Sequence, residues 1–217
     1  MSQQSPLDAG FTNAAFTETN LYTYPLNFEF SISTFTPQFT VKDAAGADVA
    51  FIKQKLFKMK EDVSVFLNSS ESTLLYKINA DRWLDWSAAY AFTEMSSQQK
   101  VGKVARQGMA SLFSARYELF DENGQQDLII TEENPWVKVA DALLSEIPIL
   151  GIFCGYFFNP KYKIVRPDGS RVALFSKNAS FFGRSFTLEQ LSTFEKGEEK
   201  RILLGLMMMV LLERRRG

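Results

Sequence analysis

The most constraining feature of this chain is an apolar stretch close to its C-terminus. Residues Ile202–Leu212 carry no polar or charged side chain, and Gly205 is the only small residue among them. A helix of this composition has no polar face, so it must be enclosed by protein or by lipid. Charged segments flank it, Glu198–Arg201 before and Glu213–Arg216 after, and acidic residues at the start suit the helix dipole.

Three interpretations of this stretch compete: a core helix surrounded by strands, a membrane-inserted tail anchor, and a partner-binding helix. Its length favours the core helix, because a helix of about 17 Å is short against the ~30 Å hydrocarbon core of a bilayer. A β-barrel also needs its interior filled, and three consecutive methionines suit an irregular, enclosed slot. The terminal arginine cluster supports the anchor.

Most of the remaining chain has the pattern of short strands. In Asn27–Ser33, apolar and polar residues alternate, which is the period-two pattern of a half-buried strand. Similar runs are Phe39–Val41, Phe51–Ile52, Val63–Leu67, Leu74–Ile78, Trp86–Phe92, Val101–Ala105, Arg116–Phe120, Leu128–Thr131, Tyr162–Val165, Arg171–Phe175 and Phe182–Leu188. About a dozen short strands predict a mainly β (α+β) protein, a closed antiparallel β-barrel of about 12 strands around the buried C-terminal helix.

Three turns between these runs share one pattern. Val41–Gly46, Leu119–Gly124 and Ile164–Gly169 each end a strand, continue through Asp or Asn, and supply a glycine for a positive φ. The pattern predicts tight hairpins, and it does not decide whether the hairpins are related or arose independently.

The domain organisation is expected to be simple. Residues 1–25 are rich in Ser, Thr, Asn and Gln and are predicted to be a flexible lead-in, followed by a single barrel domain over 26–217. Asn134-Pro135 and helical apolar spacing up to Ile147 predict an inserted helix near 135–147. The first 41 residues lack Lys and Arg, so no secretory signal is expected and the predicted location is cytoplasmic. No transmembrane span is expected.

Composition excludes several function classes. The 24 Lys+Arg against 25 Asp+Glu argue against general nucleic-acid binding. The absence of histidine and the single cysteine, Cys154, exclude Ser-His and Cys-His catalysis, structural zinc and internal disulfides. No pair of carboxylates is positioned for glycoside hydrolysis, and no glycine-rich phosphate loop is present. The protein is therefore expected not to be an enzyme, with no catalytic residue, metal or cofactor.

The best candidate binding residues are Lys53, Lys55, Lys58 and Lys60. Lys53 and Lys55 share one strand face, whereas Lys58 and Lys60 have the opposite parity, so a bulge or turn near residues 56–57 would be needed to align all four. Four ammonium groups on one face would attract a polyanionic head group or an acidic leaflet, at ~1 kcal/mol each. The alternative is a solvated strand whose lysines oppose aggregation.

Two further groups of residues each allow two interpretations. Lys100, Lys103 and Arg106 are spaced three apart and form a secondary basic patch, or else a solvated face. Trp83 and Trp86 are either an interfacial aromatic pair or barrel-packing residues.

A closed barrel threaded by an apolar C-terminal helix is the architecture of the tubby-like superfamily. The segments that carry a likeness are Phe39–Gly46, Ile52–Lys58, Val101–Arg106, Tyr117–Gly124, Tyr162–Gly169, Val172–Lys177 and the apolar tail. Over roughly residues 28–214 the chain resembles this superfamily, and within it the LURP-one-related and phospholipid-scramblase-like branch.

The resemblance implies a phospholipid- or phosphoinositide-binding protein, or one associated with a membrane surface. Tubby-type domains bind phosphoinositide head groups through basic residues on the barrel, and Lys53 and Lys55 are the closest match by position. Some scramblase-like members are linked to calcium, but Asp121–Gly124 lacks the ligand spacing of an EF-hand. The expected partner is an acidic phospholipid head group or a protein. The alternative function is an intracellular interaction or scaffold module without lipid affinity.

Overall fold

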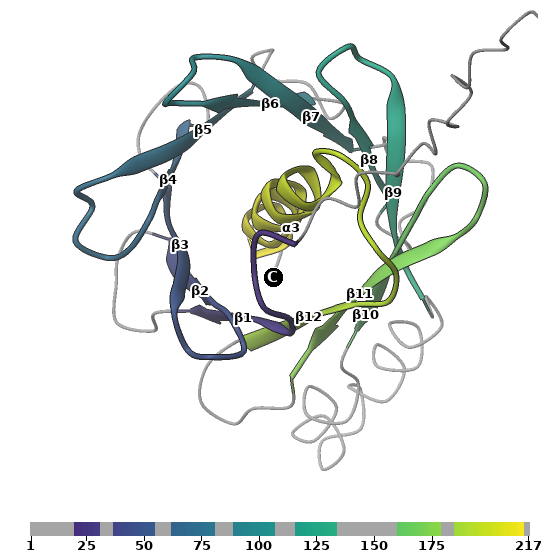
Figure 1. Ribbon diagram of the computed structural model, residues 1–217, viewed down its shortest axis with the longest axis horizontal. Coiled ribbons are helices and arrows are strands. Elements are labelled where there is room, and N and C mark those ends of the chain that lie inside the picture. Colours follow the sequence, from purple (N-terminus) through teal and green to yellow (C-terminus); the bar gives the residue numbers. More distant parts are fainter. Residues whose placement is uncertain are drawn as a thin grey trace, which may run out of the picture.

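The chain forms a closed barrel of antiparallel strands around a central helix, α3 (Figure 1). The computed structural model describes residues 20–30, 37–54, 62–80, 89–106, 116–133, 160–178 and 185–214. The elements are β1 (Leu26–Phe30), β2 (Gln38–Lys42), β3 (Asp48–Gln54), β4 (Asp62–Phe66), β5 (Leu74–Ala80), β6 (Ala89–Glu94), β7 (Lys100–Arg106), β8 (Arg116–Phe120), β9 (Gln126–Glu132), β10 (Lys161–Val165), β11 (Arg171–Lys177), β12 (Ser185–Gln190) and α3 (Glu198–Arg214). Each strand pairs with its neighbours in sequence, and β12 pairs with β1 to close the barrel. The predicted fold class is confirmed.

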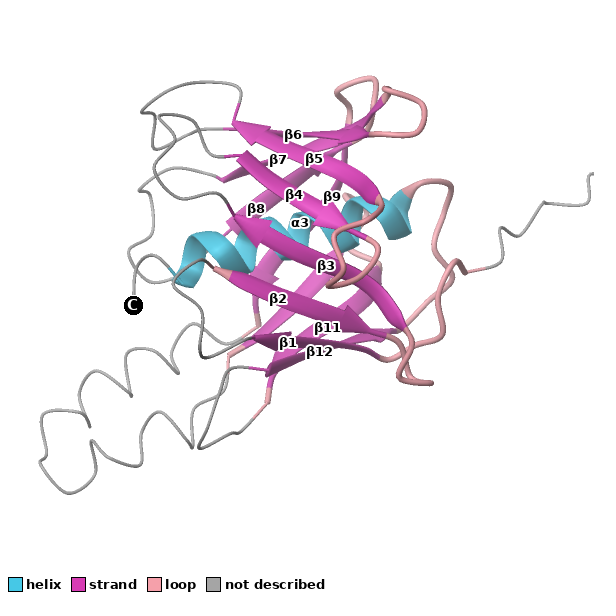
Figure 2. Ribbon diagram, turned by 90° about the vertical axis from the view of Figure 1, so that its left-hand side faces the viewer, coloured by secondary structure: helices cyan, strands magenta, loops and turns pink. Residues whose placement is uncertain are grey.

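The apolar tail is the core of the barrel. α3 runs along the interior from one end to the other (Figure 2), and Ile202–Leu211 are all buried. The core-helix interpretation is therefore confirmed. α3 approaches β7, β8 and β9 most closely. A Cβ added at Gly205 would collide with the Leu119 side chain, so glycine permits this close contact.

Phenylalanine rings fill much of the space on the other side of α3. Phe28, Phe39 and Phe175 are fully buried, on β1, β2 and β11. The Phe28 ring lies 5.0 Å from the Phe175 ring, edge to face, and 6.0 Å from the Phe39 ring. Because α3 lies off the barrel axis (Figure 1), large inward side chains are needed where the helix is distant.

The two ends of the barrel differ. α3 begins at the turn end, where the five hairpin turns 43–47, 67–73, 95–99, 121–125 and 166–170 join the strands. α3 ends at the far end, where the strands are joined through 31–37, 55–61, 81–88, 107–115, 133–160 and 178–184 (Figure 2). The predicted helix near 135–147 lies outside the described residues.

The barrel is built from repeated hairpins. The second strands of four consecutive hairpins begin at Asp48, Leu74, Lys100 and Gln126, at a constant spacing of 26 residues. All five hairpins have a bulge at the same place, because the second residue of the second strand is skipped in the pairing register. The skipped residues are Val49, Leu75, Val101, Asp127 and Val172. Four of them are apolar and pack in or against the core, and Asp127 is the exception.

The three turns singled out by sequence also have one geometry. Gly46, Gly124 and Gly169 have φ values of 81°, 84° and 89°, which confirms the predicted positive-φ position. In the first two turns, the carboxylate of Asp43 or Asp121 accepts two backbone N–H groups of its own turn. Arg166 occupies the corresponding place in the third turn, and its side chain donates to the carboxylate of Glu198 on α3 instead of to its own turn.

Candidate functional site

Lys53, a predicted binding residue, lies on the outer face of β3. Its ammonium group is 2.6 Å from the carboxylate of Glu71, and the Lys53 side chain is 37% exposed. A surface ion pair of this kind is weak, so Lys53 stays accessible to other anions. Lys55, Lys58 and Lys60 lie outside the described residues, and the alignment of the four lysines stays a prediction.

The secondary basic patch does not form one surface. Lys103 lies on the outer face of β7, with its ammonium 4.8 Å from the centre of the Phe120 ring. Arg106 has the parity of the inner face, and its guanidinium lies 5.8 Å from the Tyr117 ring. Lys100 is exposed at the turn end. The strand pleat and the bulge therefore send the three cations to different places.

The first turn of α3 carries the charged side chains that fix the helix in the barrel. Glu198 contacts the β10–β11 turn, Glu199 the segment before β1, Lys200 the end of β6, and Arg201 the β8–β9 hairpin. An α-helix turns by about 100° per residue, so four consecutive residues reach all round the barrel wall. These four residues and their partners are termed the first-turn clamp.

Arg166 holds the first residue of the clamp. Its Nε and Nη2 each lie 2.8 Å from a carboxylate oxygen of Glu198, a bidentate pair. Nη2 also donates to the carbonyl oxygen of Thr193. Glu198 in turn accepts the backbone N–H of Glu195, which satisfies a donor ahead of the helix. Hydrogen bonding to Glu198 raises the pKa of Arg166.

Arg201 is the most deeply buried cation of the clamp, with a side chain 7% exposed. Its Nε lies 2.6 Å from Asp127, and its Nη1 lies 3.3 Å from Glu122. Burial raises the pKa of Asp127, and the positive charge of Arg201 opposes that rise. A Cβ at Gly102 would collide with the carbonyl oxygen of Phe120 and lie 2.8 Å from Cδ of Arg201, so glycine on β7 makes room for both.

Lys200 and Glu199 complete the clamp on the remaining sides. The Lys200 ammonium lies 3.0 Å from Glu94, whose pKa is lowered by a hydrogen bond from Ser97 and then by Lys200. Glu199 accepts the backbone N–H of Leu21 at 2.7 Å and the hydroxyl of Tyr24 at 3.0 Å. Burial and the neighbouring Glu199 carboxylate raise the pKa of Tyr24.

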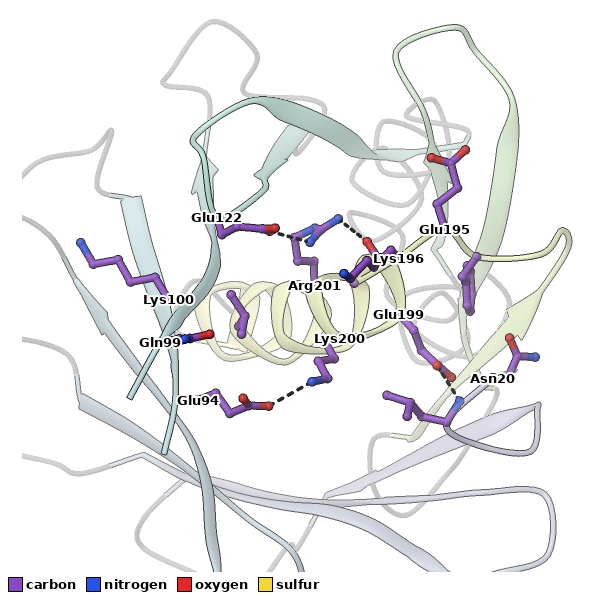
Figure 3. A pocket seen from close by; sticks show the side chains of 14 residues that line it. Asn20, Glu94, Gln99, Lys100, Glu122, Glu195, Lys196, Glu199, Lys200 and Arg201 are labelled. Carbon is purple, nitrogen blue, oxygen red and sulfur yellow. Dashed lines mark hydrogen bonds and ion pairs between the residues drawn. The ribbon is translucent and has the colours of Figure 1, made fainter. Parts of the chain in front are cut away.

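A cleft of about 420 Å³ opens between the clamp and the β6–β7 hairpin (Figure 3). Its charged lining residues are Glu94, Lys100, Glu122, Glu195, Lys196, Glu199, Lys200 and Arg201. Two ion pairs cross from the helix to the barrel wall, Lys200 with Glu94 and Arg201 with Glu122 (Figure 3). The lining thus carries four acidic and four basic side chains, of which two of each sign are joined by these ion pairs.

The described residues contain no group of three or more Asp, Glu, Cys or His side chains arranged to hold a metal ion. Within the same residues, no helix has both the length and the apolar character required to cross a bilayer. No family model matches the chain, and no curated protein matches it either.

Sequence reasoning missed the clamp. It assigned Glu198–Arg201 to the charged flank of the helix, and it treated Asn20–Pro25 as part of a flexible lead-in. The 26-residue spacing of the second strands was the signal available in the sequence. Aligning the hairpins on that spacing places Asp127 where the other hairpins carry Val or Leu, and so identifies a polar residue at a core position.

Proposed function

We propose that this barrel is a non-enzymatic module that attaches to acidic phospholipid head groups at a membrane surface through its far end. The observation that carries the proposal is the unequal distribution of aromatic and basic residues between the two ends of the barrel. The resemblance to tubby-like lipid binders supports the same function.

Aromatic residues gather in the sequence of the far-end connections. All three tryptophans of the chain, Trp83, Trp86 and Trp136, belong to segments that join strands at this end. Tryptophan favours the interface between water and lipid. The five turns at the opposite end contain no aromatic residue, and the aromatic residues elsewhere at that end are Phe194 before α3 and Tyr22 and Tyr24 before β1. Apart from Pro37, Glu133, Pro160 and Asn178, the far-end connections lie outside the described residues, so the support comes from their composition and from the strands that they join.

Charge has the same asymmetry. The far-end connections together with residues 215–217 contain eight basic and six acidic residues, whereas the five turns and residues 191–197 contain two basic and six acidic ones. Three of the eight, Lys55, Lys58 and Lys60, directly follow β3. An anionic surface would attract the far end and repel the turn end, which orients the barrel.

Vesicle sedimentation tests the proposal. The full chain is mixed with vesicles of phosphatidylcholine alone, with added phosphatidylserine, or with added phosphoinositide. We expect binding to the two acidic mixtures and little binding to phosphatidylcholine. The triple variant Lys55→Ala/Lys58→Ala/Lys60→Ala should bind about 100-fold less tightly, at ~1 kcal/mol per lysine. Raising the salt concentration should weaken binding of the unaltered chain.

A matched control uses lysines of the turn end. Lys100→Ala/Lys196→Ala removes exposed cations that have no carboxylate partner in the described part of the chain, and it should leave vesicle binding unchanged. Failure of the unaltered chain to bind any acidic vesicle would refute the membrane proposal. Equal losses in the two variants would refute the assignment to the far end.

A protein-interaction module without lipid affinity is the second candidate. One observation favours it: the exposed large apolar side chains of the described residues, Leu21, Leu67 and Leu191, all lie at the turn end. Exposed apolar side chains that gather on one surface are typical of protein contacts. If the chain does not bind acidic vesicles, the protein-interaction module becomes the better-supported candidate.

A further inference from the structure

The segment before β1 crosses the turn end and lies over the start of α3 (Figure 1). Asn20 and Gln190 exchange two side-chain hydrogen bonds, at 2.6 and 3.0 Å. The carbonyl oxygen of Thr23 accepts the backbone N–H of Ala44 in the β2–β3 turn. The Tyr24 ring packs edge to face on Phe194 at 5.6 Å. Residues 20–24 therefore contact β12, the β2–β3 turn and the approach to α3.

Glu199 makes this segment and the helix depend on each other. The residue is 7% exposed, and its two carboxylate oxygens accept from Leu21 N–H and from the Tyr24 hydroxyl. No ion pair involves Glu199 among the described residues. A buried carboxylate that loses its hydrogen-bond donors is strongly destabilised. The first turn of α3 can therefore stay packed in the barrel only while residues 20–24 donate their hydrogen bonds to Glu199.

We propose that Asn20–Tyr24 is a latch that holds the first turn of α3 in the barrel through Glu199. Displacing the latch releases the start of α3 and opens the cleft beside it, because Asn20 and Leu21 form one wall of that cleft. The coupling is reciprocal: a molecule that binds residues 20–24 loosens α3, and loosening α3 frees the segment. This device does not depend on the proposed membrane role.

Hydrogen exchange of the full chain tests the latch. Tyr24→Phe removes one donor to Glu199, and Glu199→Gln removes the charge. We expect each change to speed exchange of the Leu21 amide and of the amides in the first two turns of α3 about tenfold. The double variant should be no faster than the faster single variant, because both changes break the same contact. Amides in the middle of β9 and β10 should keep their protection.

Glu71→Gln is the control for the Glu199 variant, because it removes a carboxylate charge outside the latch, where Glu71 pairs with Lys53 of β3. It should leave exchange in α3 unchanged. If the accelerations of amide exchange in the two single variants multiply in the double variant, the proposal is overturned, because Tyr24 and Glu199 would then act separately. Equal acceleration of α3 and of the central strands would also overturn it, since α3 would then open only when the whole barrel unfolds.

Discussion

Arg201 on the first turn of α3 donates to Asp127, the bulge residue of the β8–β9 hairpin, across 2.6 Å. The bulge places one extra side chain toward the barrel interior, and in the other hairpins that side chain is apolar. One polar exception in a repeated pattern therefore marks where the helix is attached.

Asp127→Val should destabilise the protein by about 2–3 kcal/mol, because it leaves the buried guanidinium of Arg201 without its shortest partner. Valine is the residue at this place in three of the other hairpins, so the backbone can accept it. Denaturant unfolding measures the change. The double variant Asp127→Val/Arg201→Leu should recover most of the lost stability. If the double variant instead loses as much stability as the two single variants together, the pairing of Asp127 with Arg201 is contradicted.

Gly205→Ala should lower stability by about 1–2 kcal/mol, although alanine has the higher helix propensity. The added Cβ would collide with the Leu119 side chain on β8. Thermal unfolding measures the change, and Leu119→Val introduced together with Gly205→Ala should restore part of it. A gain in stability on Gly205→Ala alone would show that α3 is not packed closely on β8.

Glu94 should make stability fall in mild acid. Its pKa is lowered below the ordinary 4.5 in the folded protein, by Ser97 and then by Lys200. The folded state therefore favours the ionised form, so the stabilisation is complete above 4.5 and is lost as the pH falls through the lowered pKa. Glu94→Gln should flatten this part of the stability curve. An unchanged slope would argue against the Lys200–Glu94 pair in solution.

Tyr22 and Tyr76 should ionise near pH 12, because burial raises the pKa of each from 10 to about 12. The folded state favours the neutral phenols, so stability should fall as the pH rises from 10 towards 12. Ultraviolet titration of tyrosinate measures this directly. Tyr76→Phe should remove one late-titrating group, whereas titration of every tyrosine near pH 10 would contradict the burial.

A fragment of residues 1–197 should not fold. It lacks Ile202–Leu211, whose side chains fill the barrel interior, and a lumen emptied of ten buried residues cannot stay packed. Near-ultraviolet circular dichroism should show no tertiary signal. Met208→Asp, which places an unpaired charge at a fully buried position, should have the same effect in the full chain. A cooperatively folded fragment would refute this account of the core.

The predicted strands correspond to the twelve observed ones, because alternation of apolar and polar residues is a local property of a half-buried sheet. The ends of strands were predicted less well. The sequence run at Phe51–Ile52 covers only part of β3, which spans Asp48–Gln54. The predicted start of another run at Trp86 lies outside the described residues. The outer residues Lys53 and Lys103 were recognised as cations, but their partners, Glu71 and the Phe120 ring, lie in other strands or turns.

The sequence by itself determined the enclosed helix, since Ile202–Leu212 offers no face that water could cover. It also determined the barrel, through period-two alternation and glycine-bearing turns. Only the tertiary structure decided what holds the helix. Asp127, Arg166, Glu94 and Tyr24 are distant from α3 in the chain, and the pairing of all twelve strands into a closed barrel brings them to the first turn of the helix. Local patterns specify which side chains are buried, whereas long-range pairing specifies which charges meet.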